Sequence, residues 1–170
     1  MNSNSALAGL LQLVAASGGL VSTRIRIQKE AFLLALKGCL NFRAENFSYH
    51  HFGPFSRQLS ETLKFAVSAG LLEEKEEAFS ETTQRYSYYI TESARKFLEE
   101  VNAIPNEVLN YVTAMNKEHW RSLELAATVA YLGRTKGLSR EAAFTAAKEL
   151  KPDTVPYAEE AKKVLQTLAI

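Results

Sequence analysis

The histidines and the cysteine are the side chains of this 170-residue chain that could hold a metal ion or attack a substrate. His50 and His51 are neighbours in a stretch that alternates aromatic and polar residues as a strand does. We therefore expect their side chains on opposite faces, unable to share one ion. His119 stands alone at a predicted helix start, and Cys39, the only cysteine, is predicted to be a small core residue. The sequence predicts no metal site.

Phosphate-binding loops and paired carboxylates are also missing from the sequence. The pairs Gly18-Gly19 and Gly53-Pro54 lack the further glycines and the Lys-Ser/Thr that nucleotide-binding turns require. Asp153 is the only aspartate, so hydrolysis by two carboxylates would need glutamates that lie mostly on predicted solvated helix faces. We therefore expect no cofactor and no enzymatic activity.

The composition, with 46% hydrophobic and 23% charged residues, is that of a globular protein with one sizeable core or two smaller ones. The longest apolar runs, such as residues 125–132, are far shorter than the roughly 20 residues of a membrane span, and the first five residues carry no positive charge. We expect a cytoplasmic protein outside the membrane. Residues 1–71 carry 7 Lys/Arg and 3 Glu, whereas residues 72–104 carry 4 and 8, so the first segment is the one that could favour phosphate.

The other candidate functional residues depend on a predicted turn and on the helix that follows it. An aromatic strand over residues 46–52 is expected to meet Gly53 and Pro54, which deliver the chain to a helix. Apolar residues recur at helical spacing over 59–67, and the helix is predicted to stop at Gly70. We interpret Gly53 and Pro54 as a structural corner, because glycine tolerates backbone angles closed to other residues.

Two β-rich runs follow at residues 73–77 and 86–90, and residues 78–84 are predicted to form the loop between them. Thr91 is predicted to cap the next helix. A helix, a hairpin and a further helix in this order are typical of a winged helix. We therefore predict an α+β, mostly helical fold, with a winged-helix core over residues 1–103.

Helices are also predicted on both sides of this unit. The second helix is expected to begin near Ser22 or Thr23 and to carry four basic residues at its margins: Arg24, Arg26, Lys29 and Lys37. Residues 104–170 are predicted to be a helical extension, with a central buried helix over 123–132 and a later helix capped by Ser139. This tail is expected to pack on the core or on a second copy, which makes a homodimer one possible state.

The helix after the Gly-Pro turn presents an outer face made of Arg57, Gln58, Glu61, Lys64, Phe65 and Ser68. In a winged helix this element enters the major groove of double-stranded DNA, where arginine and glutamine read base edges. The candidates for base contact are Arg57 and Gln58. The candidates for phosphate contact are Arg24, Arg26 and Lys64.

The alternative is a protein-interaction module without DNA contact. The predicted wing is acidic where a DNA-binding wing usually carries lysine or arginine, and the candidate contacts to a protein partner are Phe65, Glu73, Glu74 and Glu76. The arrangement of the cations discriminates between the two functions. A single basic patch of Arg24, Arg26, Arg57 and Lys64 favours DNA, and scatter of these groups favours a protein partner.

Several short motifs carry a family resemblance: Arg26-Ile27-Gln28-Lys29, Phe32-Leu33-Leu34, Tyr49, Phe52-Gly53-Pro54-Phe55-Ser56, Leu59, Gly70-Leu71-Leu72 and Thr91-Glu92. With them the chain resembles the Panacea, or SocA-like antitoxin, domain over about residues 7–101, and its YwgA-like branch in particular. Residues 124–128 and 150–152 are similar to the helical tail of YwgA-like proteins. The resemblance implies a winged-helix-like core without catalysis, and a regulatory role such as toxin neutralisation or proteolytic adaptation.

Overall fold

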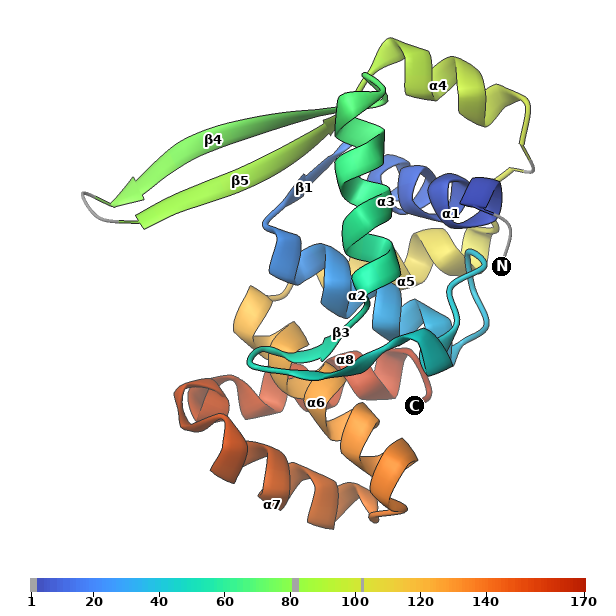
Figure 1. The fold of residues 1–170 in the computed structure, drawn as a ribbon. Coiled ribbons are helices and arrows are strands. Elements are labelled where there is room, and N and C mark those ends of the chain that lie inside the picture. The colour runs from blue at the N-terminus through green and yellow to red at the C-terminus, as the bar shows by residue number, and fades with distance from the viewer. Residues whose placement is uncertain (1–2, 81–82, 102) are drawn as a thin grey trace.

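The protein is described by a computed structural model that covers residues 3–80, 83–101 and 103–170 (Figure 1). Its helices are α1 (Ser3–Ala16), α2 (Arg24–Leu36), α3 (Arg57–Ser68), α4 (Glu92–Glu99), α5 (Asn106–Asn116), α6 (Trp120–Lys136), α7 (Arg140–Leu150) and α8 (Ala158–Thr167), with 3-10 turns η1 (Ala44–Asn46) and η2 (Pro152–Tyr157). Its strands are β1 (Leu20–Ser22), β2 (Ser48–His50), β3 (Gly53–Phe55), β4 (Leu72–Ser80) and β5 (Thr83–Ile90). The predicted α+β, mostly helical class is confirmed.

The strands form two small antiparallel sheets. One has the order β1-β5-β4, and the other pairs β2 with β3. The hairpin of β4 and β5 projects from the helical body, and β1 accompanies only the part of β5 nearest the helices (Figure 1). The sequence analysis did not predict β1, which is only three residues long.

Two predicted boundaries were wrong. Gly53 and Pro54 do not follow the strand as a turn, because they pair with His50 and Tyr49 as part of β3, and the turn lies at His51 and Phe52. Residues 78–84 are not a long loop, because β4 and β5 extend through most of them. Residues 81–82 of that predicted loop lie outside the described residues.

Hydroxyl side chains begin the helices that position the candidate site. The side chain of Ser56 accepts a hydrogen bond from the backbone N–H of Leu59 at the start of α3, and Thr91 accepts one from Ala94 at the start of α4. Such caps satisfy N–H groups that have no partner within the first turn. The predicted caps at Thr91 and Ser139 are confirmed.

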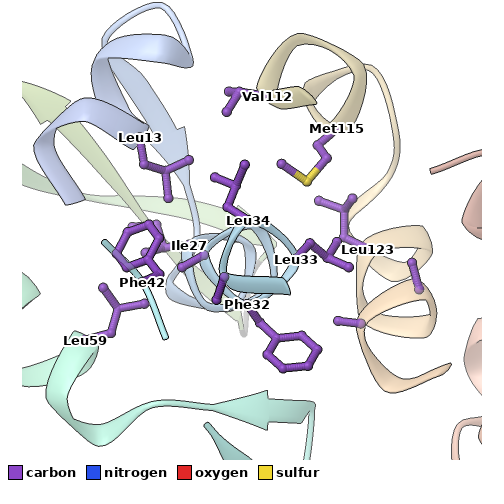
Figure 2. Close-up of a cluster of buried hydrophobic side chains, with 14 of the residues drawn as sticks. Leu13, Ile27, Phe32, Leu33, Leu34, Phe42, Leu59, Val112, Met115 and Leu123 are labelled. Atoms are coloured by element: carbon purple, nitrogen blue, oxygen red, sulfur yellow. The ribbon is translucent and has the colours of Figure 1, made fainter. Parts of the chain in front are cut away.

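The core is built around α2, whose buried side chains lie among those of four other helices and whose other neighbours include β3. Figure 2 shows Ile27, Phe32, Leu33 and Leu34 of α2 among side chains of four other helices: Leu13 of α1, Leu59 of α3, Val112 and Met115 of α5, and Leu123 of α6. All of these are less than 5% exposed. Buried apolar residues before and after residue 103 therefore belong to one contiguous core, and α6 packs directly on α2.

Candidate interaction surface on α3 and the hairpin

The outer face of α3 carries charges of both signs beside an exposed aromatic ring. The side chain of Arg57 is 88% exposed and lies 3.0 Å from the carboxylate of Glu61, one helical turn away. Gln58 is half-buried and accepts a hydrogen bond of 3.1 Å from the side chain of Asn46. Lys64 is exposed, and Phe65 is 56% exposed. Because Arg57 is paired with Glu61, this end of the helix has little net positive charge.

A groove of about 220 Å³ separates α3 from β4. Its lining residues are Arg24, Ser60, Leu63, Lys64, Val67, Ser68, Glu74 and Tyr88. The structure therefore brings three of the predicted site residues together here: Arg24, Lys64 and Glu74. The groove combines apolar walls with two cations and one carboxylate, which suits a mixed polar and apolar surface of a partner.

The polar groups of the groove are held by a network around Tyr88. The Nε of Arg24 donates to the Tyr88 hydroxyl at 2.6 Å, and that hydroxyl donates to Glu74 Oε2 at 2.5 Å. A guanidinium nitrogen of Arg24 also lies 3.1 Å from the same Glu74 oxygen. Although burial opposes ionisation of Glu74, the hydrogen bonds from Tyr88 and Arg24 lower its pKa. Arg24 is thus neutralised within the chain rather than presented to a phosphate.

The acidic residues of β4 divide between the two faces of the hairpin. Successive side chains of a strand alternate, so Glu74 and Glu76 share one face and Glu73 lies on the other. Glu76 accepts a hydrogen bond of 3.2 Å from Tyr86, its cross-strand neighbour. Glu73 is 59% exposed and lies 3.7 Å from Lys75. Of the three predicted partner contacts on β4, only Glu74 and Glu76 lie on the same face as the groove.

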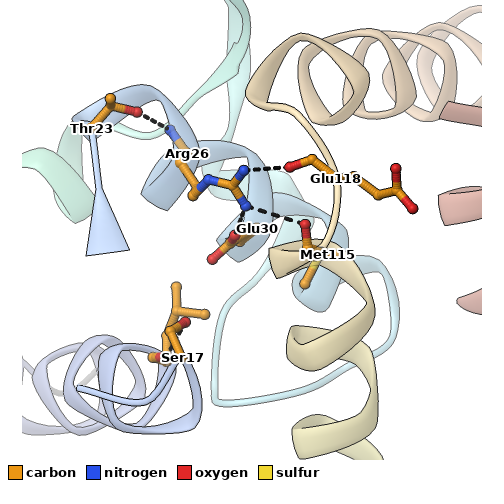
Figure 3. Close-up of polar contacts among 7 residues, drawn as sticks. Ser17, Thr23, Arg26, Glu30, Met115 and Glu118 are labelled. Atoms are coloured by element: carbon orange, nitrogen blue, oxygen red, sulfur yellow. Dashed lines mark hydrogen bonds and ion pairs between the residues drawn. The ribbon is translucent and has the colours of Figure 1, made fainter. Parts of the chain in front are cut away.

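Arg26 does not belong to this surface, although the sequence grouped it with the phosphate contacts. Its side chain is only 14% exposed and pairs with Glu30, which is fully buried, at 3.0 Å. The guanidinium also donates to the carbonyl oxygens of Met115 and Glu118, at 3.2 and 2.6 Å (Figure 3). Arg26 therefore binds α2 to the end of α5 and to the connection before α6.

Gln28 and Lys29 of α2 bind backbone groups that lie just before α3, which the sequence analysis missed. The amide of Gln28 donates to the carbonyl of Ser56 and accepts from its N–H, at 3.0 and 2.8 Å. Lys29, predicted at the margin of its helix, is only 2% exposed, and its ammonium donates to the carbonyl of Pro54 at 2.7 Å. The partner that buries Lys29 is 25 residues away, so helical spacing gives no signal for it.

A second buried pair lies next to Lys29. Glu124 of α6 and Lys151, at the end of α7, are both buried and lie 3.2 Å apart. Burial, followed by the charge of Lys151, lowers the pKa of Lys29 to about 7, against the attraction of Glu124. Lys29 binds β3, and the neighbouring Glu124 and Lys151 belong to the helical tail, so these buried charges join the two parts of the core.

The pKa of Lys29 predicts how stability depends on pH. Because the folded pKa lies near 7, below the ordinary 10.5, the unfolded chain binds more protons between these values, and stability should rise with pH. In the native chain the free energy of unfolding should rise by up to about 1.4 kcal/mol per pH unit between about pH 7 and 9.5, and Lys29→Met should remove this rise. Urea unfolding at several pH values measures it, with the exposed Lys136→Met as control. Parallel pH profiles for Lys29→Met and the native chain would contradict it.

The histidines lie apart from the groove. His50 ends β2 and His51 lies in the turn, so the expectation that they point to opposite faces of a strand was wrong, and their rings meet edge to face at 4.9 Å. His119 caps α6, accepting the N–H of Arg121, and stacks on Tyr157 at 4.6 Å. Within the described residues no group of three His, Cys, Asp or Glu side chains is placed to hold a metal ion.

Comparison with known proteins gives one informative similarity. The chain is 27% identical over 164 residues to a protein of Bacillus subtilis (strain 168) named "Uncharacterized protein YwgA". The alignment covers 92% of this chain and 96% of YwgA, so it includes helices of the tail as well as α3 and the hairpin. No family model matches the chain. In the described part of the chain, every helix is too short or too polar to span a bilayer.

Proposed function

We propose that this protein is a non-enzymatic regulatory module that binds another protein through α3 and the adjoining hairpin face. The observation that supports this is the pairing of the predicted phosphate-binding and base-reading arginines inside the chain. Arg26 binds Glu30 and two carbonyls, Arg24 binds Glu74 and Tyr88, and Arg57 binds Glu61. A surface whose arginines are neutralised in this way releases few counterions from DNA, which is the main source of affinity for a phosphate backbone.

The proposed scaffold is a winged helix. The chain order of α1, β1, α2, α3, β4 and β5, with β1 pairing to β5, supports this topology, in which α3 is the recognition helix and β4–β5 the wing. The resemblance of several motifs to Panacea domains is our ground for proposing an antitoxin-like or adaptor role in the cytoplasm, whereas the similarity to YwgA, a protein named as uncharacterized, supports only the relationship itself. In that role the partner meets Phe65, Lys64 and the groove rather than a nucleic acid.

The matched experiment compares the partners of two variants. Full-length tagged protein, purified from its native cells, should lose its partner when Phe65→Ser removes the exposed ring, because buried aromatic side chains dominate most protein interfaces. Leu150→Ser is the control, since Leu150 is 51% exposed and Phe65 is 56% exposed. A set of partners that is unchanged by Phe65→Ser but lost in Leu150→Ser would move the interface to the tail.

DNA binding is the second candidate, favoured by the exposure of Arg57 and Lys64 on one helix. We expect no binding of a mixed-sequence duplex by fluorescence anisotropy at about 50 mM salt, a permissive condition for electrostatic association. If binding occurs, Lys64→Ala should reduce the salt slope by about one unit, and Arg57→Ala should cost roughly 1–3 kcal/mol and relax sequence preference. That outcome would replace the protein-partner function by DNA recognition.

A further inference from the structure

Strand β1 ends early and leaves part of the sheet edge uncovered. It pairs with residues 87–89 of β5, and the N–H of Thr23 then donates to the carbonyl of Tyr86 at 2.8 Å. Thr23 has φ of 79° and ψ of 138°, and its side chain caps α2, so the chain turns away from the sheet at this residue. Beyond this point β5 continues to Thr83 with only β4 beside it among the described residues.

The backbone groups on that open edge can be assigned from the bonds that are made. In an antiparallel sheet the N–H and C=O of one residue point to the same side, and alternate residues point to alternate sides. Ile90 donates to Gly19 and Tyr86 accepts from Thr23, so even-numbered residues of β5 face the β1 edge. The N–H of Tyr86 and both backbone groups of Gln84 therefore face outward along the line of β1.

A cleft of about 830 Å³ lies against this edge. Its lining comes from residues 22–26 at the end of β1 and the start of α2, residues 84–86 of β5 and residues 117–120 at the start of α6. The walls carry the apolar side chains of Ile25, Tyr86 and Trp120. The edge of β5 thus offers main-chain hydrogen bonds, and the lining offers apolar contact to an extended chain.

The charges of the cleft favour an acidic occupant. Its lining includes four cationic residues, Arg24, Arg26, Arg85 and Lys117, and one carboxylate, Glu118. The Glu118 side chain is 12% exposed and lies 3.5 Å from Lys163. Lys117 is exposed at the rim. Arg24, Arg26 and Arg85 are each paired with a carboxylate, Glu74, Glu30 and Glu77 respectively, so the cation that a carboxylate on a bound segment would meet is the exposed Lys117.

We propose that this cleft binds an extended acidic segment of a partner protein, which adds to the sheet as a strand antiparallel to β5 in line with β1. Main-chain bonds to Gln84 and Tyr86 give affinity, and alternate side chains give specificity, as in other strand-addition complexes. One face of the segment places an apolar side chain against Tyr86 and Trp120, and the other brings carboxylates to Lys117. The inference rests on the proposed protein-binding function and adds a second contact site to it.

The test uses the full chain and a synthetic peptide of alternating glutamate and valine. Nuclear magnetic resonance titration should shift the amides of Gln84 and Tyr86 and slow their hydrogen exchange, because the peptide would cover that edge. Gln84→Pro should weaken binding at least about tenfold, since proline removes the outward N–H without breaking a bond to β4. Gln84→Ala keeps the N–H and should bind like the native chain. A peptide with lysine in place of glutamate should bind more weakly.

Three results would overturn the strand proposal, and each is separable from the proposed function. Unchanged Gln84 and Tyr86 amides at millimolar peptide would show that the edge does not bind a strand. Shifts centred on Phe65 would leave the α3 surface as the interface and remove the cleft. Concentration-dependent shifts of the same two amides without peptide would identify a second copy of the chain as the occupant. Loss of partner capture in Phe65→Ser tests the proposed function independently of all three.

Discussion

Arg26→Met should lower the free energy of unfolding by about 3–5 kcal/mol, the range for removing one partner of a buried ion pair. Its partner Glu30 is fully buried, and the second carboxylate oxygen of Glu30 has no hydrogen-bond partner among the described residues. The substitution would also leave the carbonyls of Met115 and Glu118 without their donor. The effect is expected to be large because one side chain joins α2, α5 and the connection to α6.

Urea denaturation of two neighbouring arginine variants gives the matched measurement. Arg24→Met removes an arginine whose side chain is 54% exposed, and such pairs are worth about 0–1 kcal/mol. Burial raises the pKa of Glu30 from its ordinary 4.5 to about 7. The contribution of Glu30 to the free energy of unfolding therefore falls as the pH rises from 4.5 through 7. Without Arg26 the pKa should rise further, and the fall should extend to higher pH. Equal losses in Arg24→Met and Arg26→Met would contradict the assignment.

Gly53→Ala should cost about 2–5 kcal/mol, because it combines backbone strain with a steric clash. Gly53 has φ of +85°, and a Cβ there would lie 2.6 Å from the hydroxyl oxygen of Thr128. That hydroxyl donates to the carbonyl of Glu124 at 2.8 Å, so it is not free to move aside. Close approach of β3 to α6 thus requires glycine at this position.

The two causes can be separated by thermal melts of a control and a double variant. Gly70 has φ of +70°, and a Cβ there would meet no atom of the described residues within 4 Å, so Gly70→Ala measures strain alone, about 1–3 kcal/mol. In a Thr128→Ala background the clash is removed, and Gly53→Ala should then cost about 1–3 kcal/mol less. Additive effects of Gly53→Ala and Thr128→Ala would show that the two residues do not meet.

Local sequence signals were sufficient for the helices with hydroxyl caps and periodic apolar faces. Thr91 and Ser139 begin helices as predicted, and most of residues 123–132 lie buried in α6. The strand boundaries were less accurate, because β2 and β3 are each three residues long and their pairing, not their composition, defines them. Short strands carry too few residues for alternation to be read reliably.

The candidate site was predicted by residue type but not by partner. Arg24, Arg26 and Lys29 are alike in the sequence as basic residues on one helix, yet they are respectively half-exposed, mostly buried and fully buried. Their hydrogen-bond partners are respectively Glu74, Glu118 and Pro54, which lie 25 to 92 residues away along the chain. Contacts at that separation depend on how the helices pack, which residue spacing does not encode.

Arg24 is shared by two hollows of the surface, so a ligand in either one would touch a residue that also lines the other. It lines both the groove beside α3 and the cleft beside the β5 edge, where its guanidinium lies 4.4 Å from the centre of the Tyr86 ring. A carboxylate that binds Arg24 from the cleft competes with Glu74 for the same guanidinium. If ligands bind both hollows and this competition couples them, occupancy of either would change the affinity of the other by the same factor, as thermodynamic reciprocity requires.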